Sequence, residues 1–168
     1  MTLKALVLLI LLCLPMTACT RDKGSLPHGT GSVAPDFATQ DLAGRTIRLS
    51  SLAGKVVLLE FFATWCPPCR ASIPSLVTLQ NRYGDKGLTI LAVSVDEGDN
   101  LPATLANFSK EQGINYTVLL GNESISNAYQ VSGIPVSFLI DKTGKINSTH
   151  VGLMENDGAM SAAIEKLL

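Results

Sequence analysis

Residues 56–70 read Val-Val-Leu-Leu-Glu-Phe-Phe-Ala-Thr-Trp-Cys-Pro-Pro-Cys-Arg, and this stretch decides the fold of the chain. Its first part, 56–62, is apolar on both alternating faces except at Glu60, which predicts a buried central strand. A segment with helical spacing of apolar residues, 69–83, follows almost directly. Cysteines separated by two residues at a strand-to-helix junction can close a small disulfide ring and open it again. The stretch therefore predicts redox chemistry.

The same cysteine pair is also half of a zinc site, but the chain lacks the other half. Structural zinc takes four ligands. The remaining cysteines, Cys13 and Cys19, lie near the N-terminus, and the histidines, His28 and His150, show no ligand spacing. A c-type haem site needs His directly after the second cysteine, where Arg70 stands instead. We therefore predict no metal and no other cofactor.

The N-terminal residues have the composition of a signal peptide rather than of a folded segment. Lys4 gives a short positive start, and Ala5 to Leu14 is an unbroken apolar run. The run is shorter than the ~20 residues that span a bilayer but suits a signal-peptide core. Met16-Thr17-Ala18-Cys19 resembles a lipobox, although Leu or Val is usual at its first position. An ordinary secretory signal and an uncleaved anchor are the alternatives.

We accordingly expect a lipoprotein signal peptide at 1–18, a flexible tether at 19–32 and one domain at 33–168. Cleavage would leave Cys19 N-terminal and acylated, which makes it the predicted lipidation site. The tether is polar and rich in Gly, and we expect its His28 to be solvated. The chain has a net charge of −1 with no basic patch, so we predict no nucleic-acid partner.

Strand-like and helix-like segments interleave along the predicted domain, which indicates the α/β class. Turn residues at 41–45 and 141–144 predict one hairpin near each end of the domain. We interpret the acidic loop 96–100 as a solvated helix N-terminus. The expected strands are 37–40, 46–49, 56–62, 88–95, 115–120, 136–140 and 145–151, and the expected helical segments are 50–54, 69–83, 101–112, 124–129 and 155–168.

Further blocks accompany the central stretch in a fixed order. They are Val33-Ala34-Pro35-Asp36-Phe37, Leu49 to Lys55, Ala92-Val93-Ser94-Val95-Asp96, and 133–141. Together they resemble the thioredoxin superfamily, and within it the membrane-tethered, extracytoplasmic thiol–disulfide oxidoreductases of the TlpA/ResA type. The resemblance implies a thioredoxin-like fold, with a central mixed sheet flanked by helices and an added N-terminal β-hairpin.

Within this family pattern, we expect Cys66 to be the exposed, attacking thiol. It falls at a helix start, where free N–H groups and the helix dipole favour a thiolate. We expect Cys69, one turn further in, to be more buried and to resolve the mixed disulfide by attacking the Cys66 sulfur. Trp65, Pro67 and Pro68 are expected to form a rigid rim that contacts the substrate.

Glu60 lies six positions before Cys66, where thioredoxins carry a buried acid beneath the disulfide. Burial of an isolated carboxylate is costly unless it is paired or protonated, so we expect desolvation to raise its pKa. Glu60 then becomes a proton acceptor for Cys69. The alternative is a strand end open enough to leave Glu60 solvated.

Two other positions follow from the resemblance. Pro135 matches the cis-proline that faces the active site throughout the superfamily, which exposes the backbone of Ile134 for pairing with a substrate peptide. ResA-like reductants often carry Glu shortly after the second cysteine, and here Ser72 occupies that region. This departure argues against a specificity for apocytochrome c that depends on such an acid.

The leading hypothesis is an enzyme that exchanges the Cys66–Cys69 disulfide with protein thiols outside the cytoplasm. The resemblance favours a periplasmic reductant of the kind used in cytochrome c maturation. Its partners would be protein thiol or disulfide substrates, a membrane electron donor of the thiol–disulfide type, and the membrane through the N-terminal lipid anchor. The dipeptide between the cysteines tunes the potential but does not fix the direction of electron flow.

Two alternatives are weighed against this hypothesis. A peroxiredoxin-like peroxidase would align its reactive cysteine with Cys69, but Phe62 and Cys66 stand where its Pro and Thr are required. A peptide-binding, chaperone-like module would use the Ile134–Pro135 groove and keep its cysteines oxidised. Insulin reduction with an added dithiol separates the enzyme from such a module.

Overall fold

The computed structural model of the protein describes residues 28–155 and 158–168. Its five-stranded sheet has the order β5-β4-β3-β6-β7, with β3 (Val56–Phe62) at the centre. β3 runs parallel to β4 (Leu88–Ser94), which runs parallel to β5 (Thr117–Leu120). On the other side, β6 (Val136–Ile140) pairs antiparallel with β3, and β7 (Ile146–Val151) pairs antiparallel with β6. The thioredoxin-like fold with a mixed sheet is therefore confirmed.

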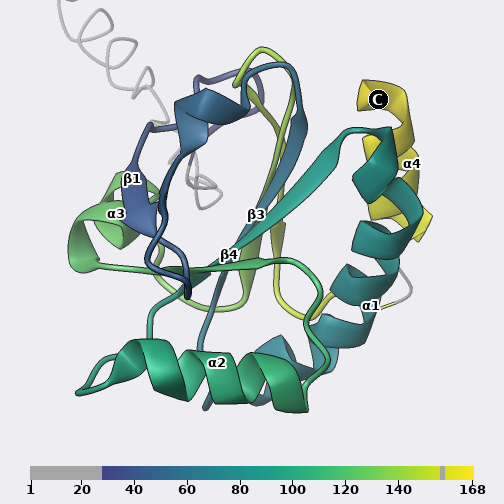
Figure 1. The fold of residues 1–168 in the computed structure, drawn as a ribbon. Helices are drawn as coiled ribbons and strands as arrows, with labels where there is room; N and C mark the ends of the chain where they lie inside the picture. Colours follow the sequence, from purple (N-terminus) through teal and green to yellow (C-terminus); the bar gives the residue numbers. More distant parts are fainter. Residues whose placement is uncertain (1–27, 156–157) are drawn as a thin grey trace, which may run out of the picture.

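Helices cover the two faces of this sheet (Figure 1). One face packs against α1 (Pro67–Tyr83), α2 (Leu101–Glu111) and α4 (Gly158–Leu167). The opposite face packs against α3 (Glu123–Ala128) and the N-terminal segment. The parallel connections β3-α1-β4 and β4-α2-β5 run in the same direction, which places their helices on one face by the right-handed crossover rule.

The predicted N-terminal hairpin is present as a separate two-stranded sheet. β1 (Ala38–Gln40) pairs antiparallel with β2 (Thr46–Arg48), and the 3-10 helix η2 (Leu49–Leu52) leads into β3. A second short 3-10 helix, η3 (Gly84–Lys86), links α1 to β4. Asp41 bridges to Leu119, so the hairpin lies beside the outer edge of β5.

The end of the predicted tether packs against the domain. The N–H of Gly31 donates to the Ile146 carbonyl (2.7 Å), and the N–H of Ile146 donates to the Ser32 carbonyl (2.8 Å). His28, expected to be solvated, donates from Nε2 to the carbonyl of Ala128 (2.7 Å). Residues 28–32 of the expected tether thus contact the domain, and their backbone pairing with β7 satisfies an otherwise open strand edge.

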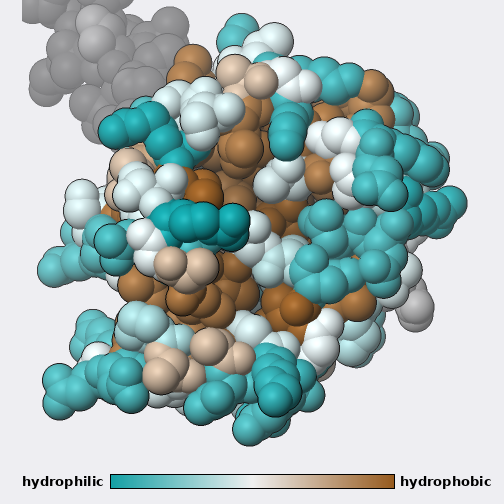
Figure 2. Space-filling view, viewed as in Figure 1, coloured by the Kyte–Doolittle hydropathy of each residue, from teal (hydrophilic) through white to brown (hydrophobic). Residues whose placement is uncertain are grey.

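Apolar side chains gather between the hairpin and α1 (Figure 2). β5 pairs only with Leu91 to Ser94, so the first residues of β4 lack a neighbour on that side. A pocket of about 390 Å³ opens there, with Ile90 and Tyr116 among its lining residues. This pocket is lined by neither Cys66 nor Cys69.

Candidate active site

The two cysteines meet where β3 ends and α1 begins. Cys66 is the N-cap of α1, and Cys69 lies in its first turn. They form a disulfide with an S–S distance of 2.09 Å and a Cα–Cα distance of 5.3 Å. The helix starts at Pro67, two residues before the predicted start. Proline is tolerated in the first turn because the N–H that it lacks would have no partner within the helix.

The sulfur of Cys66 accepts a hydrogen bond from the helix that it caps. The donor is the backbone N–H of Cys69, at 3.2 Å. Pro67 and Pro68 occupy the positions between the cysteines and carry no N–H, so Cys69 supplies the first N–H of α1. The dipole of a helix of this length also favours negative charge at Cys66. A thiolate on Cys66 is therefore stabilised from one side by one N–H and the helix dipole.

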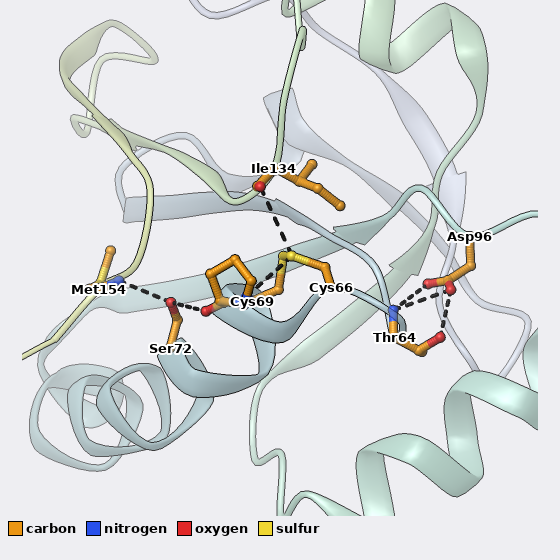
Figure 3. The surroundings of a disulfide bond; sticks show 8 residues. Thr64, Cys66, Cys69, Ser72, Asp96, Ile134 and Met154 are labelled. Carbon is orange, nitrogen blue, oxygen red and sulfur yellow. Dashed lines mark hydrogen bonds between the residues drawn. A yellow bond between two sulfur atoms is a disulfide. The ribbon is translucent and has the colours of Figure 1, made fainter.

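Both sulfur-bearing residues are buried in this oxidised state. Cys66 is 3% exposed and Cys69 is 1% exposed, so the expected exposure of Cys66 is not found. The Ile134 carbonyl lies 4.0 Å from Cys66 Sγ and covers it from above the helix (Figure 3). A disulfide sulfur carries no hydrogen, so this approach is a contact, and only a reduced Cys66 can donate to that carbonyl.

The predicted substrate-binding residues surround the disulfide. Trp65 is 68% exposed, and Pro67 and Pro68 are also exposed. Ile134 is half-buried on the opposite side, and the Ile134–Pro135 peptide bond is cis, as the resemblance implied. An apolar indole and a backbone carbonyl thus flank the disulfide at the surface.

Glu60 is buried on the sheet face that carries α1. It shares that face with Leu58 and Phe62, because alternate strand residues point the same way. Its side chain is 2% exposed, and Oε2 has no hydrogen-bond partner among the described residues. Burial raises the pKa of Glu60 to about 8. The predicted buried acid is present, and the solvated alternative is excluded.

Glu60 and Cys69 belong to neighbouring parts of one core. Phe62, two residues along β3 from Glu60, packs in a single cluster with Cys69 and with Ala92, the β4 residue paired with Glu60. Tyr116 packs against the clusters on this face, and burial together with the charge of Glu60 raises the pKa of its hydroxyl. The carboxyl group of Glu60 therefore sits in an apolar layer that Cys69 also enters.

Ser72 fills the position at which the resembled reductants carry an acid. Its side chain is 1% exposed, and its hydroxyl donates to the Pro68 carbonyl (3.0 Å). The same hydroxyl accepts from the N–H of Met154 (2.9 Å), which ties α1 to the segment before α4 (Figure 3). Both hydrogen-bonding functions of Ser72 are used, so its role is to join two elements.

Sequence reasoning missed a contact between Thr64 and Asp96. The carboxylate of Asp96 accepts from the N–H of Thr64 at 3.0 and 3.2 Å and from its hydroxyl at 2.6 Å. The sequence interpretation had assigned Asp96 to a solvated loop. A signal was present, because β3 and β4 are consecutive parallel strands, and residues that follow their carboxyl ends meet at one edge of the sheet.

Residues 30–149 match the model of the AhpC/TSA family. The chain belongs to this thioredoxin-like family. It is 38% identical over 125 residues to the thiol–disulfide oxidoreductase ResA of Bacillus subtilis, covering 74% of this chain and 68% of that protein. The ResA of Geobacillus thermodenitrificans is also 38% identical, over 128 residues, which are 76% of this chain and 72% of that protein.

Solved structures agree with this family membership. A thiol:disulfide interchange protein from Chlorobium tepidum superposes with a TM-score of 0.72 at 30% identity, over 83% of this chain and 98% of that one. The family, the relatives and the Cys66–Cys69 pair together make this AhpC/TSA-family protein a thiol–disulfide oxidoreductase. Protein thiols or disulfides are its implied substrates.

The predicted signal peptide, the first part of the tether and the lipidation site Cys19 lie outside the described residues. Among the helices within 28–155 and 158–168, none combines the length and the apolar character needed to cross a bilayer.

Proposed function

We propose that this oxidoreductase is an extracytoplasmic reductant, held at the periplasmic side of the membrane by a lipid on Cys19. It would take electrons from a membrane donor of the thiol–disulfide type and pass them to protein disulfides. The substrates would be of the kind that arise in cytochrome c maturation, as the sequence resemblance implies. Because Ser72 offers no carboxylate, substrate recognition falls to the exposed Trp65 and to the backbone of Ile134.

The direction of electron flow is supported by the poor stabilisation of a thiolate on Cys66. A dithiol protein is a strong oxidant when its reduced form is stabilised, and N–H donors at a helix start supply much of that stabilisation. An N-cap side chain accepts from the second or the third helical residue, and here the second is Pro68, so the N–H of Cys69 is the one donor left. A less stabilised thiolate makes the reduced form a better electron donor.

The buried acid completes the cycle of proton transfers. At pH 7 a carboxyl group with a pKa of about 8 is mostly protonated. When a donor thiolate attacks Cys66 Sγ, the disulfide breaks and Cys69 leaves as a thiolate that takes the proton of Glu60. The second thiolate of the donor then attacks its own sulfur in the mixed disulfide, which closes the donor disulfide and releases Cys66 as a thiolate. Two electrons have entered the pair, and Glu60 is ionised.

Reduction of the substrate returns this proton. The Cys66 thiolate attacks a substrate disulfide, and one substrate sulfur leaves as a thiolate. Cys69 then gives its proton to Glu60 and attacks Cys66 Sγ, which releases the second substrate sulfur. The protein ends with the Cys66–Cys69 disulfide closed and Glu60 protonated, as it began. A buried carboxyl with a pKa near the working pH suits both halves of this cycle.

The reduction potential of the Cys66–Cys69 couple tests the proposed direction. We expect a potential more negative than about −180 mV, the value of a disulfide isomerase, measured by equilibration with a dithiol and read by Trp65 fluorescence. A potential near that of a strong disulfide oxidant, about −120 mV, would reverse the direction. Insulin reduction with an added dithiol should show turnover, and absence of turnover would favour the peptide-binding module.

A further inference from the structure

We propose that Asp96 is a positioning residue for the attacking thiol. Its carboxylate fastens the turn between β3 and α1 to the end of β4, and so holds Cys66 Sγ over the N–H of Cys69. The inference rests on the proposed function in one respect, the assignment of Cys66 as the thiol that attacks the substrate.

The Asp96 carboxylate holds Thr64 in place through hydrogen bonds. The turn 63–66 closes through the N–H of Cys66, which donates to the Ala63 carbonyl at 3.2 Å. Within this turn both polar groups of Thr64 donate to the Asp96 carboxylate, the hydroxyl at 2.6 Å and the N–H at 3.0 Å to the nearer oxygen. Figure 3 shows Asp96 and Thr64 beside Cys66, on the side away from Ser72. A carboxylate held by several donors is a strong anchor.

Asp96 is itself held in position by Ser94 at the end of β4. Ser94, the last residue of β4, is 0% exposed; its hydroxyl donates to Asp96 Oδ2 (2.7 Å) and accepts from the N–H of Asp96 (3.0 Å). The Ser94 carbonyl accepts from the N–H of Gly121 at 3.0 Å. A Cβ at residue 121 would lie 2.0 Å from that carbonyl oxygen, so glycine alone permits the approach. The anchor is therefore fixed to the sheet.

The Thr64–Asp96 hydrogen bonds matter most when the Cys66–Cys69 disulfide is reduced. In the oxidised protein the S–S bond holds Cys66 beside Cys69, but reduction removes that bond. The hydrogen bonds of Cys66 to Ala63 and Arg70 link it only to its own segment, whereas Thr64 and Asp96 link that segment to β4. Because Cys69 supplies the first N–H of α1, a displaced thiolate loses that donor. A displacement of about 1 Å can cost ~10²-fold in rate.

The negative charge of Asp96 and its hydrogen bonds to Thr64 have opposite effects on the pKa of Cys66. A carboxylate near a thiolate disfavours it, so loss of the charge alone should lower the pKa of Cys66. Loss of the hydrogen bonds to Thr64 alone should raise that pKa, because the Cys66 thiolate would move away from the N–H of Cys69. Thr64→Val removes the hydroxyl bond and leaves the charge. Asp96→Asn removes the charge and keeps an acceptor for Thr64, and Asp96→Ala removes both.

The test measures iodoacetamide alkylation of the reduced full chain against pH, with the modified cysteine located by mass spectrometry, and the rate of attack on a model disulfide peptide. We expect Asp96→Ala to slow attack about tenfold and to raise the pKa of Cys66, on the scale of one lost charge-assisted hydrogen bond. Thr64→Val should shift both readouts in the same direction by a smaller factor, and Thr64→Ser should restore them. Asp96→Asn should lie closer to the wild type than Asp96→Ala.

Asp141→Ala is the matched control. Its carboxylate accepts from the N–H groups of Thr143 (2.8 Å) and Lys145 (3.0 Å) in the hairpin between β6 and β7. Ile140 pairs with Val57, at the end of β3 away from Cys66. This variant should lower thermal stability and leave the alkylation profile of Cys66 unchanged.

Two results would overturn the positioning role. One is a pKa of Cys66 that falls equally in Asp96→Asn and Asp96→Ala, which is an effect of charge. The other is unchanged attack by Thr64→Val, a variant mild enough to carry the test should Asp96→Ala not fold. Alkylation of the wild type at Cys69 instead of Cys66 would contradict a different claim, the assignment of Cys66 as the attacking thiol.

Discussion

The backbone N–H of Cys69 donates to the sulfur of Cys66 across 3.2 Å, within the first turn of the helix that Cys66 caps. An N-cap side chain normally accepts from the second or the third helical residue. Here the second residue is Pro68, which has no N–H, so the third residue carries this interaction. The strength with which α1 stabilises a thiolate is thus set by the residues between the cysteines.

Restoring the missing donor should make the protein a weaker reductant. In Pro68→Ala an N–H returns at the second helical position, within reach of Cys66 Sγ. We expect the pKa of Cys66 to fall and the reduction potential to rise by about 10–30 mV, the equivalent of one hydrogen bond. Pro67→Ala is the control, because the first N–H of a helix does not reach the N-cap side chain. Equal potentials in Pro68→Ala and wild type would contradict the argument.

The two cysteines should differ in the complexes that they trap. Cys69→Ser leaves the attacking thiol but removes the resolving one, so mixed disulfides with substrates should accumulate. Cys66→Ser should trap none. Non-reducing electrophoresis of membrane extracts, followed by mass spectrometry of the captured proteins, measures both. Equal trapping by the two variants would show that the roles are wrongly assigned.

Glu60 should control the second chemical step. Glu60→Gln keeps the shape of the side chain but cannot take the proton of Cys69. Attack by Cys66 should be nearly normal, whereas resolution by Cys69 should slow by ~10²-fold, the usual scale for a lost general base. Stopped-flow fluorescence of Trp65 with a model disulfide peptide separates the steps.

The control for this experiment is Glu97→Gln, which removes an exposed carboxylate in the loop that follows β4. It should leave both steps unchanged. If the second step of Glu60→Gln also keeps its rate between pH 6 and 8, Glu60 does not relay the proton.

The raised pKa of Glu60 predicts a dependence of stability on pH. The folded protein holds the Glu60 proton up to about pH 8, whereas the unfolded chain releases it near 4.5. The associated stability is fully present below pH 4.5 and is lost as the pH rises through 8. Between these limits the unfolding free energy of the wild type should fall by a few kcal/mol relative to Glu60→Gln. Urea titrations of both proteins at pH 5 and pH 8 measure these free energies. An equal change between the two pH values in wild type and in Glu60→Gln would refute the prediction.

The mature N-terminus should be an acylated Cys19. The lipobox-like sequence before it predicts cleavage and lipid attachment, and hence recovery of the protein with membranes. Mass spectrometry of the membrane fraction should find an N-terminal lipopeptide, and Cys19→Ser should release the protein into the soluble periplasmic fraction. An intact Met1 in the membrane fraction would show an uncleaved anchor.

Sequence alone determined those features that depend on local order along the chain. The apolar run around Glu60 predicted a buried central strand, and β3 has the expected bounds, Val56–Phe62. The cysteine pair marked the helix start, and the family pattern predicted the fold and the cis-proline at 135, both of which the structure confirms. Such features are readable because periodicity, proline and glycine act on the backbone within a few residues.

Tertiary structure decided what depends on residues distant in the chain. It covered the sulfur of Cys66 with the carbonyl of Ile134, against the expected exposure, and it packed His28 onto the domain. It also placed the Asp96 carboxylate on Thr64, although 32 positions separate them. The physical reason is that a hydrogen bond depends on distance in space, and only the alignment of β3 with β4 brings the ends of those two strands together.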